Sequence, residues 1–117
     1  MENKRLGAQG ERAAEKFLSE RGAVILKRNM RCPMGEIDLI ARMDGFLCFV
    51  EVKSRSTAAF GRPAEAVGRE KRAHIVGAAK WYLKSRGLQD ARVRFDVVEV
   101  SPQGIRHLPG AFGEKDP

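Results

Sequence analysis

Residues 35–53 read GEIDLIARMDGFLCFVEVK, and this stretch decides the fold. Its first part, residues 35–42, alternates apolar and polar side chains, as a half-buried strand does. Its last part, residues 46–53, begins with the most apolar run of the chain, Phe46 to Val50. Met43-Asp44-Gly45 between the two parts is a tight-turn signal. The stretch therefore predicts two neighbouring antiparallel strands joined in a hairpin.

The flanking sequence adds helices on both sides of this hairpin. Before it, apolar residues at helical spacing precede a short strand, and after it a longer helix precedes one or two further strands. The order predicts an α/β fold with an αβββαβ core, in which one mixed central sheet is flanked by helices. The elements expected around the hairpin are a helix over 4–21, a strand over 23–28, a helical turn at Pro63, a helix over 69–86, a strand over 92–100 and a short edge strand over 104–108.

Length and composition favour one globular domain. The chain has 117 residues, of which 43% are hydrophobic and 32% charged, as in a folded domain rather than a disordered chain. We expect this domain to span residues 1–110, and the polar tail 111–117 to fray. The longest apolar run, Phe46 to Val50, is too short to cross a membrane. No apolar region follows the basic residues at the start, so no secretory signal is expected.

The two cysteines, Cys32 and Cys48, are too few for a metal cage or a disulfide framework. A reducing cytoplasm is therefore the expected compartment.

The positive charge is concentrated in one part of the chain. The whole sequence carries a net charge of +7, and residues 54–94, with ten basic and three acidic side chains, carry a net +7 by themselves. Such a segment favours a polyanionic partner, although a solvated basic helix face would look the same. No helix-turn-helix, zinc finger or aromatic RNA-binding motif is visible, so recognition of the nucleic-acid backbone is expected. The candidate phosphate contacts are Arg55, Arg62, Arg69, Lys71 and Arg72.

Two carboxylates interrupt apolar patterns. Asp38 lies inside the strand segment Ile37-Asp38-Leu39-Ile40, where a buried carboxylate needs a metal, a lysine or several N–H donors. Glu11 lies on the helical row that also holds Ala14 and Leu18, which would turn it toward the sheet. For both residues the alternative is a solvated position, Asp38 pointing outward and Glu11 at the edge of the stripe.

Glu51 and Lys53 follow the most apolar run of the chain. They are two residues apart on a strand, so both side chains project from the face that Leu47 and Phe49 share, and this face is expected to be covered. A simple ion pair is the alternative interpretation. An Asp on one strand and Glu-x-Lys on the next can bind Mg²⁺ or Mn²⁺ beside a lysine, which is a minimal site for phosphodiester cleavage.

Several further stretches carry a resemblance to a known family. The chain resembles the YraN-like bacterial family, which is similar to archaeal Holliday-junction resolvases within the PD-(D/E)XK nuclease superfamily. The resemblance implies an αβββαβ, restriction-endonuclease-like fold. The stretches that carry it are Gly10-Glu11, residues 35–40, residues 49–55, Phe60-Gly61, residues 63–67 and residues 94–98.

The resemblance also implies roles for individual residues. Asp38 and Glu51 would be the metal ligands, with the backbone carbonyl of Val52, and Lys53 the catalytic lysine. Glu11 would be an auxiliary acid near the metal, and Lys71 would contact the scissile phosphate.

Three other residues are assigned simpler roles. Glu36 is expected to be a solvated residue at the start of its strand, and Asp96 a structural residue. Trp81 is expected to be a core or interface anchor, or, if exposed, a platform on which a base stacks.

The predicted function is a Mg²⁺- or Mn²⁺-dependent, structure-selective DNA endonuclease that acts on branched or otherwise irregular DNA. Resolution of a four-way junction needs two active sites, so the resemblance to resolvases implies a homodimer. The first alternative is a nucleic-acid-binding protein that keeps the fold without the chemistry, in repair, recombination or competence. The second is an enzyme that acts on RNA, because the site chemistry is the same for both backbones.

Overall fold

The computed structural model describes residues 2–55 and 67–114, with the backbone alone for residues 2–6. Two helices and five strands follow one another in the order predicted by the sequence. They are α1 (Glu2–Glu20), β1 (Val24–Cys32), β2 (Gly35–Met43), β3 (Phe46–Ser54), α2 (Arg69–Ser85), β4 (Val93–Ser101) and β5 (Gly104–Phe112).

The strands form one mixed sheet in the order β1-β2-β3-β4-β5. Strands β3 and β4 are parallel, and the other neighbours are antiparallel. The hairpin β2–β3 closes through Asp44 and Gly45, whose φ angles of 56° and 80° are those of a two-residue turn that follows the twist of the strands. The predicted α/β fold with a mixed sheet and flanking helices is confirmed.

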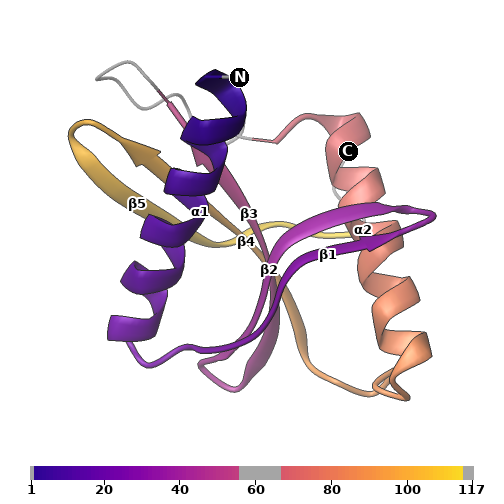
Figure 1. Ribbon diagram of the computed structural model, residues 1–117. Helices are drawn as coiled ribbons and strands as arrows, with labels where there is room; N and C mark the ends of the chain where they lie inside the picture. The colour runs from indigo at the N-terminus through magenta and orange to yellow at the C-terminus, as the bar shows by residue number, and fades with distance from the viewer. Residues whose placement is uncertain (1, 56–66, 115–117) are drawn as a thin grey trace.

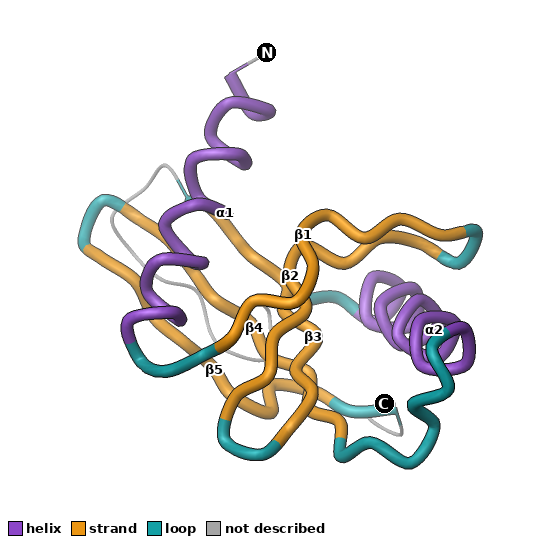
Figure 2. Tube along the Cα trace, turned by 60° about the horizontal axis from the view of Figure 1, so that its bottom comes forward, coloured by secondary structure: helices purple, strands orange, loops and turns teal. Residues whose placement is uncertain are grey.

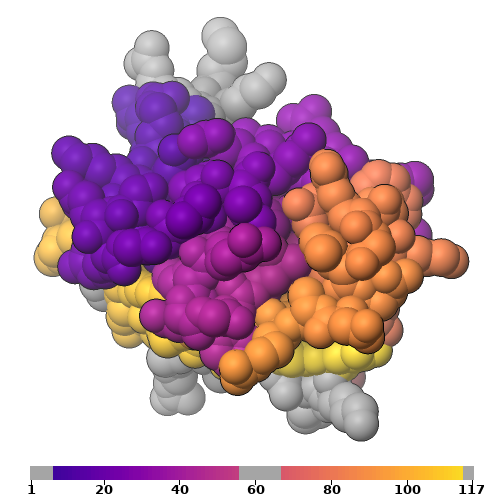
Figure 3. Space-filling model, turned by 90° about the horizontal axis from the view of Figure 1, so that it is seen from below, coloured from indigo at the N-terminus to yellow at the C-terminus, as the bar shows by residue number. Residues whose placement is uncertain are grey.

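The two helices cover opposite faces of the sheet (Figures 1 and 2). On one face, Ala14 and Leu18 of α1 pack with buried residues of the strands such as Val50. On the other face, Ile75 and the rest of the buried stripe of α2 pack against Phe49 and its neighbours. Figure 3 views the end of the molecule that carries the β2–β3 turn, where the hairpin (magenta) lies between α1 with β1 and the end of α2.

Strand β1 is longer than the sequence predicts. It continues beyond Arg28 to Cys32, because residues 30–32 stay paired with the first residues of β2 up to the pair Cys32 and Gly35.

Strand β5 is also longer than predicted, and this corrects the expectation that the chain frays from residue 111. Ala111 and Phe112 belong to β5, and Phe112 is buried with its ring stacked on Phe95 at 5.2 Å between centroids. Burial of this ring holds the end of the strand in place. Residues 115–117 of the expected tail, and the helical turn expected at Pro63, lie outside the described residues.

Candidate functional site

The site lies where β2 and β3 separate. Their pairing runs only from Met43 opposite Phe46 to Leu39 opposite Val50, and beyond that point each strand pairs with its other neighbour. At the fork, Asp38 uses its side chain in place of the missing backbone partner: its Oδ2 atom accepts a hydrogen bond from the Val52 N–H at 2.8 Å. The half-buried Asp38 is thereby held facing β3.

Three elements meet at this fork. The end of β3 and the first turns of α1 and α2 lie at the same end of the molecule, at the top of Figure 1. Together with Asp38 of β2 they line a pocket of about 320 Å³ with a largely polar surface. This carboxylate pocket is lined by Gly7, Glu11, Asp38, Glu51, Val52, Ser54 and Lys71.

Glu51 is the most perturbed acid of the pocket. Its side chain is only 7% exposed. Burial, the adjacent charge of Asp38 and a hydrogen bond between the two carboxyl groups raise the pKa of Glu51 to about 8. Lys71, whose Nζ lies 3.7 Å from Glu51 Oε2, and Lys53 act in the opposite direction. A cation bound between these two carboxyl groups would favour the ionised form of both.

Glu11 of α1 extends this acidic site. Burial first, and then the charge of Asp38, raise the pKa of Glu11, while a hydrogen bond with the side chain of Asn29 lowers it. Asn29 has a φ of 50°, a left-handed conformation that is uncommon within a strand. One turn further along α1, Glu15 forms a two-pronged ion pair with Arg28 at 2.6 Å. Both contacts fasten α1 to β1 with Glu11 beside the pocket.

The chemistry of the pocket fits a hard divalent cation. Asp38 and Glu51 offer carboxylate oxygens, which Mg²⁺ and Mn²⁺ prefer, and magnesium sites in proteins often have only one or two protein carboxylates. Among the side chains of residues 7–55 and 67–114, no group of three or more His, Cys, Asp or Glu could by itself hold a metal ion. The protein would therefore supply the carboxylate pair, while water and substrate oxygens complete the coordination.

The two lysines approach Glu51 from different elements. Lys71 projects from the first turn of α2 and lines the pocket. Lys53 stands two residues after Glu51 on the same face of β3 and is half-buried. It does not line the pocket, but its charge lowers the pKa of Glu51. The structure therefore brings Lys71 into the pocket more directly than Lys53.

The predicted phosphate contacts do not form a single track. Arg55 is paired with the buried Glu99 of β4. Arg69 and Arg72 line a different pocket, between α2 and the residues that follow β5, while Lys71 faces Glu51. The helical turn of α2 separates these neighbours in sequence, and Arg62 lies outside the described residues.

The sequence predictions gave no structural role to two residues that shape the site, Gly10 and Asn29. Gly10 lies in the middle of α1, where glycine is unfavourable. A Cβ atom at this position would lie 1.8 Å from Ser54 Oγ and 3.2 Å from Ser54 Cβ. Gly10 therefore allows α1 to approach the end of β3, which brings Glu11 to the pocket. The left-handed Asn29 had no comparable signal beyond its residue type.

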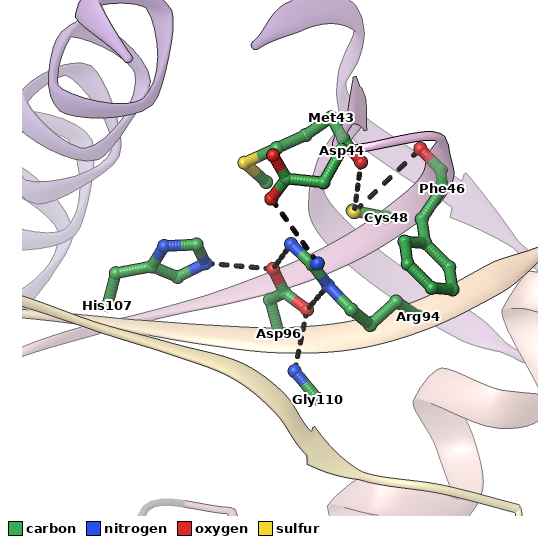
Figure 4. A network of polar contacts seen from close by, with 8 residues as sticks. All are labelled: Met43, Asp44, Phe46, Cys48, Arg94, Asp96, His107 and Gly110. Atoms are coloured by element: carbon green, nitrogen blue, oxygen red, sulfur yellow. Dashed lines mark hydrogen bonds and ion pairs between the residues drawn. The ribbon is translucent and has the colours of Figure 1, made fainter. Parts of the chain in front are cut away.

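Asp96 lies outside the site, in a closed network between β4 and β5 (Figure 4). Its buried carboxylate accepts hydrogen bonds from Arg94 Nε at 2.9 Å and from the Gly110 N–H at 3.0 Å, and it contacts His107 Nε2 at 2.8 Å. Burial would raise the pKa of Asp96, but the contacts with His107, Arg94 and Gly110 outweigh it and hold the pKa below its ordinary value. Asp96 joins β4 to β5, which agrees with its expected structural role.

Other expectations concern exposure. Glu36 is exposed and lies 3.6 Å from Arg31, so its expected place as a solvated residue is confirmed. Trp81 is 42% exposed, whereas the next residue, Tyr82, is buried in the core. No described helix is long and apolar enough to span a membrane.

Comparison with known proteins places this chain in a family. The model of the uncharacterised protein family UPF0102 matches residues 10–100. The chain belongs to the UPF0102 family. This is the YraN-like family that the sequence motifs indicated.

Members of the UPF0102 family are similar to this chain over most of their length. A UPF0102 protein of Clostridioides difficile is 45% identical over 114 residues, which cover 96% of this chain and 100% of the relative. One from Syntrophotalea carbinolica is 46% identical, with 92% and 90% covered, and one from Desulfosudis oleivorans is 51% identical, with 80% and 76% covered.

Proposed function

We propose that this UPF0102 protein is a metal-dependent endonuclease that hydrolyses phosphodiester bonds in branched or otherwise structured DNA. The observation that carries the proposal is the carboxyl pair of the half-buried Asp38 and the buried Glu51 at the fork of β2 and β3, with Lys71 against Glu51 in the same pocket. A site of this composition is suited to holding a divalent cation beside a phosphate group.

Each residue of the pocket has a separate task in this proposal. Asp38, oriented by the Val52 N–H, and Glu51 hold the cation, with the carbonyl of Val52 as a further ligand. When bound, Mg²⁺ or Mn²⁺ supplies Lewis-acid polarisation of a phosphoryl oxygen. Lys71 and Lys53 place positive charge where negative charge develops on the phosphate. Glu11 also lines the pocket, and its carboxylate can accept a proton from the attacking water.

DNA is the proposed substrate because of the charge distribution. Residues 54–94 hold a net charge equal to that of the whole chain, and they follow Glu51 and Lys53 directly. A basic segment beside an acidic metal site favours contacts to the sugar–phosphate backbone. The resemblance to resolvases favours branched DNA and a homodimer with two active sites.

A nucleic-acid-binding protein without catalysis is the second candidate. The basic segment would serve it equally well. A pure binding protein, however, gains nothing from two adjacent carboxyl groups, one of them buried with a raised pKa, beside the surface that faces phosphates.

The test is a cleavage assay with purified protein and end-labelled linear duplex, flap, four-way-junction and single-stranded RNA substrates, in Mg²⁺, Mn²⁺ or EDTA. We expect wild type to cut structured DNA only with metal, and Glu51→Gln to lose at least about 100-fold in rate, because it removes a ligand charge. Glu20→Gln, which changes an exposed glutamate at the end of α1, is the matched control and should cut like wild type.

Three outcomes would contradict the proposal. If wild type binds these substrates but cuts none of them, the binding candidate is correct. If RNA alone is cut, the substrate class is wrong. If cleavage survives in Glu51→Gln, the activity does not come from this pocket.

A further inference from the structure

A second charged cluster lies on the same face of the sheet as Glu51 and Lys53. Glu99 of β4 is fully buried, and its two carboxylate oxygens are shared between two arginines. Arg55 Nε donates to Oε2 at 2.9 Å, and Arg106 Nε donates to Oε1 at 2.8 Å, with a second contact from Arg106 Nη2. We call Arg55, Glu99 and Arg106 the Glu99 cluster.

The strand register places this cluster beside the carboxylate pocket. Lys53 is opposite Glu99 on β4, and Glu99 is opposite Arg106 on β5, so the three residues form a row across the sheet. Arg55 follows two residues after Lys53 and therefore projects from the same face of the chain. Arg55 stands four residues after Glu51. In extended chain, with a rise of about 3.3 Å per residue, this places their Cα atoms about 13 Å apart.

The cluster hides its anion and leaves its cations accessible. The carboxylate of Glu99 has no exposure, whereas the side chains of Arg55 and Arg106 are 30% and 31% exposed. Two guanidinium groups on one carboxylate leave a net positive charge, and Lys53 adds another beside them. The exposed side of the cluster is therefore cationic.

The Asp96 network shows what a purely structural arrangement looks like in the same sheet. There the arginine, Arg94, is only 15% exposed, and the carboxylate also contacts His107 and the backbone N–H of Gly110. That network is closed around its anion. In the Glu99 cluster, by contrast, both cations are about twice as exposed as Arg94. The exposure of both arginines, and not the burial of the carboxylate, therefore distinguishes the Glu99 cluster from a network that only joins strands.

We propose that Arg55 and Arg106, positioned by Glu99, bind a backbone phosphate of the nucleic acid whose reacting phosphate lies in the carboxylate pocket. The inference rests on the proposed function and adds to it the place where the neighbouring part of the strand is held. Arg55 lies about 13 Å along the chain from Glu51, so the phosphate that it binds is a near neighbour of the reacting phosphate and not the reacting phosphate itself. Glu99 is a positioning residue, because it touches the arginines and not the substrate.

The test measures binding separately from cleavage. Fluorescence anisotropy gives the Kd of the protein for a labelled four-way junction and for a linear duplex. EDTA is present so that no strand is cut, and KCl is varied over about 50–300 mM, where the salt dependence is steep. Each lost phosphate contact should reduce the slope of log K against log salt by about 0.9. We therefore expect Arg55→Gln and Arg106→Gln each to reduce the slope by about one and to weaken binding about tenfold at low salt.

Arg42→Gln is the matched control. Arg42 is an exposed arginine of β2 beside the β2–β3 turn, opposite Leu47 and so at the far end of β3 from Arg55. Arg42→Gln removes the same charge from the chain as Arg55→Gln and Arg106→Gln do. The slope of log K against log salt for this variant should equal that of wild type.

Glu99→Gln separates positioning from net charge. The substitution makes the chain more positive, so a count of charges predicts tighter DNA binding, whereas the positioning role predicts weaker binding. Thermal unfolding checks that the variant is folded. If it is not, Arg55→Lys replaces it: the charge remains but the forked guanidinium is lost, so binding should weaken while the salt slope stays the same.

The outcomes distinguish this inference from the proposed function. If wild type cuts DNA but Arg55→Gln and Arg106→Gln keep its affinity and slope, the inference is wrong and the nuclease proposal stands. If both slopes fall while wild type never cuts, the phosphate-binding pair is supported and the nuclease proposal fails. If wild type binds no nucleic acid, or Glu99→Gln binds more tightly, the inference is wrong.

Discussion

At the scale of single residues, carboxylates in this sheet are stabilised in different ways. Asp96 and Glu99 are fully buried, and each accepts hydrogen bonds from arginine. Asp38 and Glu51 instead lie against each other, and the pKa of Glu51 is raised. Shifts of this kind are common among groups at functional sites, which agrees with the role proposed for Glu51.

The Asp96 network predicts a pH-dependent loss of stability. Asp96→Asn should cost about 2–4 kcal/mol at pH 7, because it removes the buried anion of the mostly buried Arg94 and leaves it only the exposed Asp44. The pKa of Asp96 is lower in the folded state than its ordinary 3.8. Its contribution to stability is therefore present above about pH 4 and is lost as the pH falls through the folded-state value.

Urea unfolding at pH 7, 5 and 3 measures this contribution. The difference in the free energy of unfolding between wild type and Asp96→Asn should be the same at pH 7 and 5 and smaller at pH 3. A difference that grows on acidification, or none at pH 7, would refute the assigned role. Asp44→Asn is the control, because Asp44 is exposed and contacts Arg94 at 3.4 Å.

At the scale of elements, the local signals were sufficient for the hairpin. The alternating residues 35–42 end just before the turn at Asp44-Gly45. Asp38 and Glu51 also lie within a few residues of this turn, one on each side of it. Strand β5 was predicted to end at residue 108, whereas it continues through Pro109 and Gly110 to Phe112. In an edge strand, proline is tolerated, and Phe112 beyond it is anchored by a distant residue, Phe95.

The approach of α1 to β3 yields a prediction with an internal control. In an open helix, Gly→Ala should stabilise the protein by about 0.5–1 kcal/mol. Gly7→Ala should show this gain, because no atom lies within 4 Å of the added Cβ. Gly10→Ala should show none or a loss, because its Cβ would meet Ser54.

Chemical denaturation of both variants provides the measurement, and Ser54→Gly is the rescue. In the Gly10→Ala/Ser54→Gly double variant the crowding is relieved, so the effect of Gly10→Ala on the free energy of unfolding should become favourable. An equal gain for Gly10→Ala and Gly7→Ala in the wild-type background would mean that α1 does not approach β3 as closely as the structure has it.

At the scale of the whole molecule, the sequence located the positive charge but not its arrangement. The excess lies within residues 54–94, as the counts show. In space, Lys71 faces Glu51, Arg55 joins Glu99, and Arg69 with Arg72 lines a different pocket. A helix distributes neighbouring residues around its axis, so a run of charge along the chain does not become a single track.

The candidate site could be predicted only in part, because only some of its contacts join residues that are close in sequence. Asp38 and Glu51 stand on adjacent strands of one hairpin, so their closeness follows from a local pairing. The Glu99 cluster depends on the parallel pairing of β3 with β4, strands that lie more than forty residues apart in sequence. Glu99, within the run Val97-Val98-Glu99-Val100, gave no signal of its arginine partners.

The central claim is that Asp38 and Glu51 together hold one divalent cation. Mn²⁺ binding, followed by electron paramagnetic resonance of the free ion during titration, measures it without any nucleic acid. We expect one Mn²⁺ per chain for wild type and for Glu20→Gln, and a loss of at least about tenfold in affinity for Asp38→Asn and for Glu51→Gln. If the wild-type chain binds no Mn²⁺, or if the Asp38 and Glu51 variants bind it as wild type does, these two residues do not form a cation site.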